Sequence, residues 1–137
     1  MLEDHHLQAT TTADGSVTLR HIPLDVLYRS DQGAIGEAKH VFIGGTGLPD
    51  IQHAWRVLEL GFGTALTFLV TAEAAQVSGR TLVYTAVDAA PIPPGFVPAN
   101  FTCSALVERV LHAVRNERQT ITMSHGDIHL TLHPHPW

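Results

Sequence analysis

A pair of glycines between a strand-like run and a helix-like run constrains the fold of this chain most. Residues 55–60 are mainly aliphatic, Gly61-Phe62-Gly63 ends that run, and residues 64–76 carry apolar side chains at near-helical spacing. The apolar run 81–87 follows, which is typical of a strand buried in a parallel sheet. The order strand, glycine turn, helix, strand predicts a βαβ unit and an α/β fold.

The remaining segments add strands and a second helix to this unit. Runs 7–12 and 16–20 flank Asp14-Gly15, which predicts an N-terminal β-hairpin, and we expect residues 21–49 to form an extended arm. Prolines between 91 and 98 forbid regular structure there. The pattern beyond them predicts a helix over 101–115, a strand over 119–123, and a strand or short helix over 128–132.

Together these segments predict a three- to four-stranded, mainly parallel, doubly wound sheet with helices on its faces and an N-terminal hairpin arm. We expect one compact unit, in which residues 1–50 form the arm and residues 51–137 form the sheet domain.

Composition narrows the class of protein. The 137 residues carry 8 basic and 13 acidic side chains, so a net charge of −5 gives no basic footprint for nucleic acid. No apolar run approaches the ~18 residues of a membrane span, and the first residues do not resemble a signal peptide. We therefore expect a cytoplasmic chain without a membrane partner. The single cysteine, Cys103, cannot form an internal disulfide, and we expect it to be buried rather than reactive.

The glycine turn is a candidate nucleotide site. Glycines let the backbone turn sharply and approach a ligand, and the following helix end offers N–H groups. Asp88 follows Gly63 by 25 residues, at the tip of the next strand, where a carboxylate can hydrogen-bond the hydroxyls of a ribose. The alternatives are a tight turn without a ligand and, for Asp88, a helix cap or turn residue.

The turn favours S-adenosylmethionine over NAD. A dinucleotide site has a third glycine where this chain has Leu66, which would crowd a pyrophosphate. Glu59 stands two residues before Gly61, as in the E-x-G-x-G motif of class I methyltransferases, where an acid lies near the ammonium of the cofactor. Asp127, at the end of a predicted third strand, is placed to accept a hydrogen bond from an adenine amino group; a solvated turn is the alternative.

Four blocks of the sequence, residues 24–30, 37–43, 47–49 and 59–69, resemble the methyltransferase domain of the bifunctional tRNA-modifying MnmC family. The resemblance runs from about residue 14 to 132. It implies a Rossmann-like class I methyltransferase fold and methyl transfer from S-adenosylmethionine to the aminomethyl nitrogen of a tRNA wobble uridine. Nothing here corresponds to the family's second, FAD-dependent domain. With the turn, the resemblance gives the expected cofactor-binding residues: Tyr28, Glu59, Gly61, Phe62, Gly63, Thr64, Asp88 and Asp127.

The family continues beyond the position of Trp137 with an Asp-Gly-Phe-Ala-Pro loop that lines its transfer site. We therefore expect a truncated fold that binds the cofactor weakly and methylates tRNA poorly on its own, unless a partner chain or an oligomer completes it. No catalytic residue is assigned. The alternatives are a non-catalytic cofactor- or protein-binding remnant of the fold and, less favoured, a fragment of an NAD-dependent oxidoreductase.

Four histidines near the end of the chain, His125, His129, His133 and His135, are dense enough to suggest a metal site. Pro134 and Pro136 interrupt any helix there, and no cysteine lies nearby. We expect a solvated tail and no metal.

Overall fold

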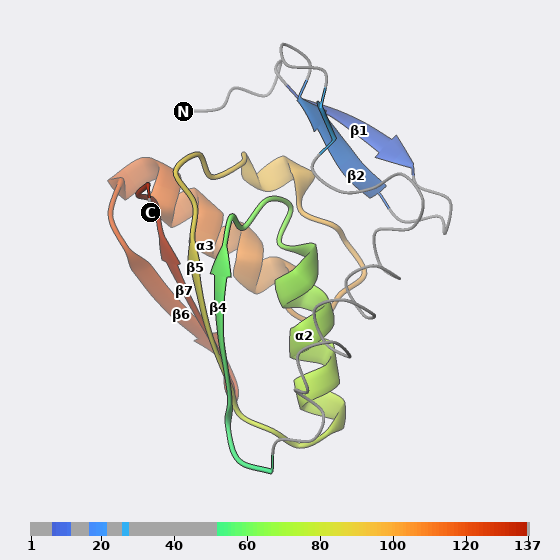
Figure 1. Cartoon of the computed structure of the whole chain (residues 1–137), viewed down its shortest axis with the longest axis vertical. Helices are drawn as coiled ribbons and strands as arrows, with labels where there is room; N and C mark the ends of the chain where they lie inside the picture. The colour runs from blue at the N-terminus through green and yellow to red at the C-terminus, as the bar shows by residue number, and fades with distance from the viewer. Residues whose placement is uncertain (1–6, 12–16, 22–25, 28–51, 137) are drawn as a thin grey trace.

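The computed structural model describes residues 7–11, 17–21, 26–27 and 52–136 (Figure 1). Strands β1 (Leu7–Thr11) and β2 (Val17–His21) pair antiparallel, so the predicted hairpin is confirmed. The short strand β3 (Val26–Leu27) pairs antiparallel with β2, within the segment expected to be an extended arm. The predicted Asp14-Gly15 turn lies outside the described residues.

The second sheet has four strands in the order β4-β5-β7-β6. Strands β4 (Trp55–Leu60), β5 (Leu82–Val87) and β7 (Ile128–His133) are parallel, and β6 (Ile121–His125) pairs antiparallel with β7. The chain is therefore α/β with a mixed, mostly parallel sheet, and residues 128–133 form a strand rather than a helix. Leu60, Val87 and His133 stand at one register level, so the three parallel strands end at one edge, here called the carboxyl edge.

The two described α-helices, α2 (Leu66–Val77) and α3 (Ser104–Glu117), cover the same face of this sheet (Figure 1). Alternate residues of β5 and β7 are fully buried beneath them, as expected for strands whose two faces differ. The core combines these residues with apolar side chains of both helices: Leu82, Tyr84, Ala86, Ile128, Leu130, Leu132, Phe68, Leu69, Leu106, Val110, Leu111 and Val114. For the described residues, the expectation of helices on both faces is wrong.

Helix α3 runs toward the carboxyl edge, an unexpected direction, because the loop before it is long. Residues 88–103 contain four prolines and one short 3-10 turn, η4 (Pro94–Phe96), where the sequence predicted no regular structure. The backbone N–H of Thr102 donates to Glu73 Oε1 on α2 (3.2 Å), and Arg115 Nη1 donates to the Pro91 carbonyl (2.8 Å). The loop thus carries the chain down along α2, and α3 returns toward the carboxyl edge. Strand β6 therefore runs antiparallel to its neighbour, β7.

None of the helices in the described ranges is both long and apolar enough to cross a membrane.

Candidate cofactor site

The glycine turn after β4 has a backbone that only glycine adopts easily. Gly61 and Gly63 have φ values of 87° and 56°, and Ala65 shares this left-handed region at 70°. The Gly61 N–H donates to the Val87 carbonyl (2.8 Å), which fastens the turn to the end of β5. Three left-handed residues in five fold the chain back so that α2 begins directly at the carboxyl edge.

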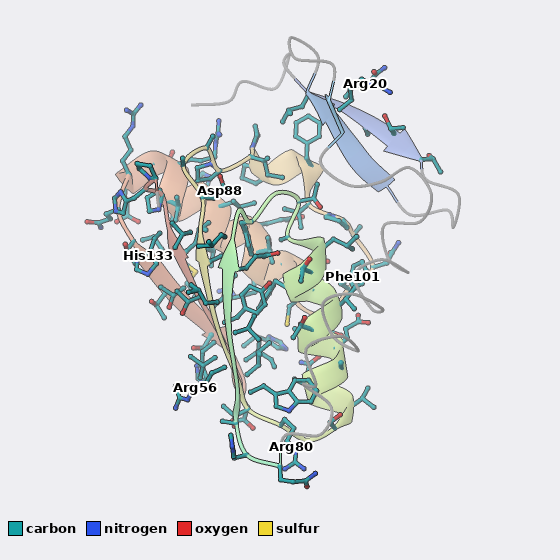
Figure 2. All side chains as sticks on the ribbon, viewed as in Figure 1. Arg20, Arg56, Arg80, Asp88, Phe101 and His133 are labelled. Carbon is teal, nitrogen blue, oxygen red and sulfur yellow. The ribbon has the colours of Figure 1, made fainter. Side chains whose placement is uncertain are left out.

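Asp88 lies against this turn, as its place at the tip of the neighbouring strand predicted. Its Oδ2 accepts the backbone N–H groups of Phe62 (2.9 Å) and Gly63 (3.1 Å), and its Oδ1 accepts that of Ala90 (2.9 Å). Its own N–H donates to the carbonyl of His133 (3.0 Å). Through its carboxylate and its backbone N–H together, Asp88 therefore joins all three parallel strands at their carboxyl edge, where Figure 2 labels it at the upper end of the sheet.

Glu59 lies one residue before the end of β4 and points to the helix-covered face. Its Oε1 accepts a hydrogen bond from the Tyr84 hydroxyl (2.8 Å), and Tyr84 is fully buried. A carboxylate held by a buried phenol keeps one orientation, because the alternative would leave that hydroxyl without its acceptor. Glu59 is thus fixed close to the turn, with Asp88 at the end of the adjacent strand.

Phe62 and Leu66 have buried side chains, so neither side chain faces a ligand at the turn. Phe62 is 1% exposed, and its ring lies 6.3 Å from that of Phe68. Leu66 packs in a second apolar cluster with Val70 and Phe101. The expected contribution of Phe62 is therefore limited to its backbone, and the steric argument against a pyrophosphate at Leu66 is not supported by the direction of its side chain.

The N-terminus of α2 has no side-chain cap. Its N-cap residue is Ala65, and no acidic residue occupies the first turn. The unsatisfied N–H groups of a helix start attract acceptor groups of a ligand. The carboxyl edge thus combines a glycine turn, an uncapped helix start and two oriented carboxylates.

Asp127 lies far from these residues, so the expectation that it joins them is wrong. It occupies the turn between β6 and β7, and its carbonyl accepts the N–H of Leu82, the first residue of β5. That is the opposite edge of the sheet from Asp88. The prediction assumed a third parallel strand ending near Asp127, whereas β6 runs antiparallel. Tyr28 lies outside the described residues.

The residue that reaches the carboxyl edge instead is His133, at the end of β7. The sequence does not predict this position, because the pattern of residues 128–132 fits either a strand or a short helix. Three of the histidines expected in a solvated tail are strand residues: His125 belongs to β6, and His129 and His133 belong to β7. The Nδ1 atoms of His129 and His133 lie 2.6 Å and 2.8 Å from the hydroxyls of Ser124 and Thr120. Within the described ranges, no three potential ligands gather as a metal site would require.

Cys103 is 1% exposed and precedes the first residue of α3. Burial, and secondarily the negative charge of Glu73, raises the pKa of the Cys103 thiol. The thiol is therefore a buried core group, as expected, and not an activated nucleophile.

Arginines do not gather around Asp88 among the side chains labelled in Figure 2. Arg56 and Arg80 lie toward the amino end of the sheet, and Arg20 lies on the hairpin. Arg80 donates to the carbonyl and the side chain of Gln52. Arg115, in the last turn of α3, instead donates to the Pro91 carbonyl in the loop after Asp88, so this arginine lies near the carboxyl edge.

Comparison with known proteins connects this geometry to one family. The tRNA 5-methylaminomethyl-2-thiouridine biosynthesis bifunctional protein MnmC of Delftia acidovorans is 46% identical over 56 residues, which are 39% of this chain and 9% of that protein. The MnmC of Leptospira borgpetersenii is 47% identical over 53 residues, covering 34% and 8%. MnmC2 from Aquifex aeolicus superposes on 92% of this chain with a TM-score of 0.62 and 22% identity. Part of the chain is thus similar in sequence to MnmC proteins, and its fold is similar to that of MnmC2.

The relation to MnmC is partial. The chain covers 41% of the Aquifex MnmC2 structure, and the matched stretches are less than a tenth of the curated MnmC proteins. No protein-family model matches the chain. The resemblance to MnmC seen in the sequence is nevertheless confirmed, both by curated relatives and by the shared fold.

Proposed function

We propose that the carboxyl edge binds S-adenosylmethionine and that this MnmC-related chain acts, in the cytoplasm, as part of a methyltransferase of tRNA wobble-uridine type. The observation that carries the proposal is Asp88, whose carboxylate lies within hydrogen-bond distance of the Phe62 and Gly63 N–H groups. An acid at this position beside a glycine turn suits an adenosyl ribose. The uncapped start of α2 and the oriented carboxylate of Glu59 suit the amino acid end of the same molecule.

The residues present fit this cofactor, but Asp88 and Glu59 already form hydrogen bonds that compete with it. A carboxylate offers about four lone-pair positions, and three of those on Asp88 are occupied by backbone N–H groups. One position remains for a ribose hydroxyl unless the carboxylate releases the turn. Glu59 is likewise engaged, by the Tyr84 hydroxyl. These competing bonds support weak rather than tight binding, because a second cofactor hydrogen bond at Asp88 would replace an existing one.

S-adenosylmethionine, when bound, supplies an electrophilic methyl group. The protein would then have to hold an acceptor nitrogen in line with it, unprotonated and at near-attack distance. Among the described residues of the carboxyl edge, the two carboxylates are engaged with the turn and with Tyr84, so neither is assigned to an acceptor. This favours the second candidate function, cofactor binding without catalysis by the chain alone.

Two assays separate these functions. Calorimetry should detect binding of S-adenosylmethionine and S-adenosylhomocysteine and no binding of NAD. Tighter binding of NAD would contradict the proposed cofactor. Transfer of a radiolabelled methyl group to tRNA bearing the free aminomethyl uridine should be slight or absent with the chain alone. Robust turnover would favour a complete enzyme and reject the binding-only candidate.

A further inference from the structure

Strand β4 forms one edge of the four-stranded sheet, and β5 is its only neighbouring strand among the described residues. The N–H groups of Trp55 and Gly61 both donate to carbonyls on the β5 side (2.8 Å each). Successive residues of a strand point their backbone groups to opposite sides, so every second residue of β4 faces β5. The N–H and C=O groups of Arg56, Leu58 and Leu60 therefore point away from β5, along what is here called the β4 edge.

The β4 edge lacks the features that protect edge strands from pairing. Such strands usually carry lysine, proline or a bulge, whereas β4 contains neither residue and pairs with β5 in unbroken register. Leu58 and Leu60 are 67% and 59% exposed on the face opposite α2 and α3, here called the outer face. Arg56 is the one charged residue of β4 on that face. At the other edge of the sheet, the hydroxyls of Thr122 and Ser124 on β6 hydrogen-bond to side chains of β7 (2.8 Å and 2.6 Å). Two exposed leucines on an unprotected edge point to a partner strand.

We propose that the β4 edge pairs antiparallel with the same edge of a second copy of this chain, about a two-fold axis beside Leu58. In this register Leu58 lies opposite Leu58 of the second copy, and Leu60 of each copy lies opposite Arg56 of the other. Each of these pairs can exchange two N–H···O bonds, because both members point their backbone groups across the β4 edge. A shift by one residue would oppose these groups to residues that face β5, and a shift by two would lose one pair. The axis at Leu58 therefore pairs the whole strand.

The same two-fold arrangement is favourable for the side chains. On the outer face, the leucines at 58 and 60 of both copies form one apolar strip across the axis, where apolar cross-strand pairs are stabilising. The two Arg56 side chains lie at opposite ends of the pairing, about 13 Å apart along the strands, so they do not repel each other directly. The axis relates the same surface of both copies, so the pairing closes as a dimer and does not continue into a fibre.

A single strand sets the size of this interface. Strand β4 has 6 residues and is about 20 Å long, so two copies bury less than the ~800 Å² per partner of a standard complex. We therefore expect a reversible dimer with a Kd of about 10–100 µM.

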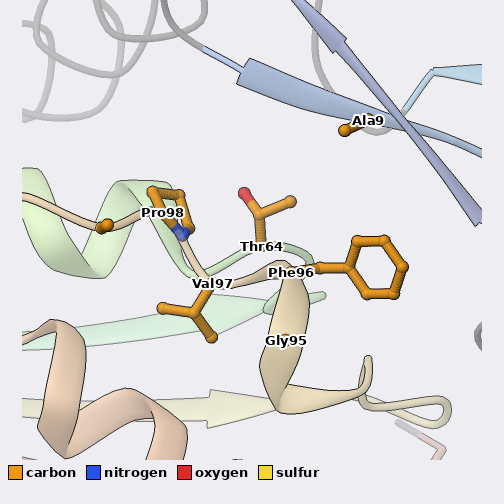
Figure 3. Close-up of a pocket in the computed structure, with 7 residues that line it drawn as sticks. Ala9, Thr64, Gly95, Phe96, Val97 and Pro98 are labelled. Carbon is orange, nitrogen blue, oxygen red and sulfur yellow. The ribbon is translucent and has the colours of Figure 1, made fainter.

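The β4 edge is separate from the candidate cofactor site. Glu59 points to the helix-covered face, opposite Leu58 and Leu60. The pocket beside the glycine turn (Figure 3) is lined by Thr64 and by residues of β1 and of the loop before α3, with no contribution from β4 among its described walls. We expect dimerisation with or without the cofactor.

Sedimentation velocity of the whole chain over a series of concentrations measures the monomer–dimer equilibrium. Leu58→Lys brings two ammonium groups opposite each other at the axis and should raise the Kd at least about tenfold. Thr122→Lys is the matched control, because it adds the same charge on the outer face at the other edge of the sheet and should leave the Kd unchanged. A monomer at about 1 mM, assembly beyond a dimer, or a dimer that Leu58→Lys leaves intact would exclude this pairing.

Amide hydrogen exchange shows whether the backbone of the β4 edge takes part. The N–H groups of Leu58 and Leu60 should exchange at least about tenfold more slowly in the dimer, because they gain acceptors across the axis. Two copies packed by their outer faces would bury the leucine side chains without this protection, and that result would reject edge pairing. If Leu58→Lys does not fold, the exchange of the unaltered chain at low and high concentration decides the question alone.

Discussion

Replacing Asp88 by alanine should destabilise the chain more than any other single change at the carboxyl edge. The carboxylate accepts three backbone N–H groups, two from the glycine turn and one from the loop after β5. A hydrogen bond to a charged group contributes about 1.5–3 kcal/mol in net terms. Asp88 is half-buried, so water replaces part of the loss. We expect Asp88→Ala to lower the free energy of unfolding by about 2–4 kcal/mol.

Replacing Asp88 by asparagine should destabilise the chain less than alanine does, because asparagine keeps part of the hydrogen-bond geometry. Its amide oxygen can still accept the N–H groups of Phe62 and Gly63, as weaker neutral bonds, while its NH₂ group faces the N–H of Ala90. We expect Asp88→Asn to cost about 1–2 kcal/mol. The matched control is Asp127→Ala at the opposite edge, where the exposed side chain should change stability by less than about 0.5 kcal/mol.

Urea unfolding followed by far-ultraviolet circular dichroism measures all three variants under one protocol. The expected order of destabilisation is Asp88→Ala, then Asp88→Asn, then Asp127→Ala. A loss below about 0.5 kcal/mol for Asp88→Ala would show that the carboxylate does not hold the turn against β5.

Three further predictions concern the glycine turn, the buried thiol of Cys103 and the end of α2. Gly63→Ala should cost about 1–2 kcal/mol, because its φ of 56° is unfavourable with a side chain; Gly95→Ala, whose added methyl meets nothing within 4 Å, should not. Cys103, whose thiol pKa is raised, should react with a disulfide reagent at least about 100-fold faster in urea, and its contribution to stability should disappear as pH rises through that folded pKa. Val77→Lys should raise the melting temperature, because Val77 is 90% exposed in a last turn without basic residues.

The part of the fold that the sequence predicts is the part set by local pattern. The aliphatic run 55–60, the glycine turn and the apolar run 81–87 specify β4, α2 and β5 to within about two residues. Asp88 meets the turn because the carboxyl ends of neighbouring parallel strands share an edge. No distant contact is needed for either inference.

The direction of β6 is set by a long-range feature. The loop 88–103 leads the chain along α2 before α3 begins, and nothing in its composition says how far it descends. One local signal was nevertheless present. Gly126-Asp127 stands between two β-prone runs, as Asp14-Gly15 does in the N-terminal hairpin, and predicts antiparallel pairing by the same reasoning. Applied there, it would have moved Asp127 to the opposite edge.

The hydrogen bonds of Asp88 to the turn were beyond sequence reasoning for a different reason. A pattern can bring a carboxylate to a strand tip, but the rotamer that turns both of its oxygens toward backbone N–H groups depends on the left-handed residues around Gly63. The position of Asp88 at the strand tip was therefore predictable. The hydrogen bonds that its carboxylate accepts from the protein's own backbone were not.

Amide NMR during titration with S-adenosylhomocysteine shows whether the carboxyl edge binds the cofactor at Asp88. We expect the N–H resonances of Phe62 and Gly63, which donate to Asp88, to shift as the ligand binds, while that of Asp127 at the opposite edge does not. Asp88→Asn should weaken the titration. Saturable binding that shifts residues 126–128 and leaves the turn unchanged would contradict the account.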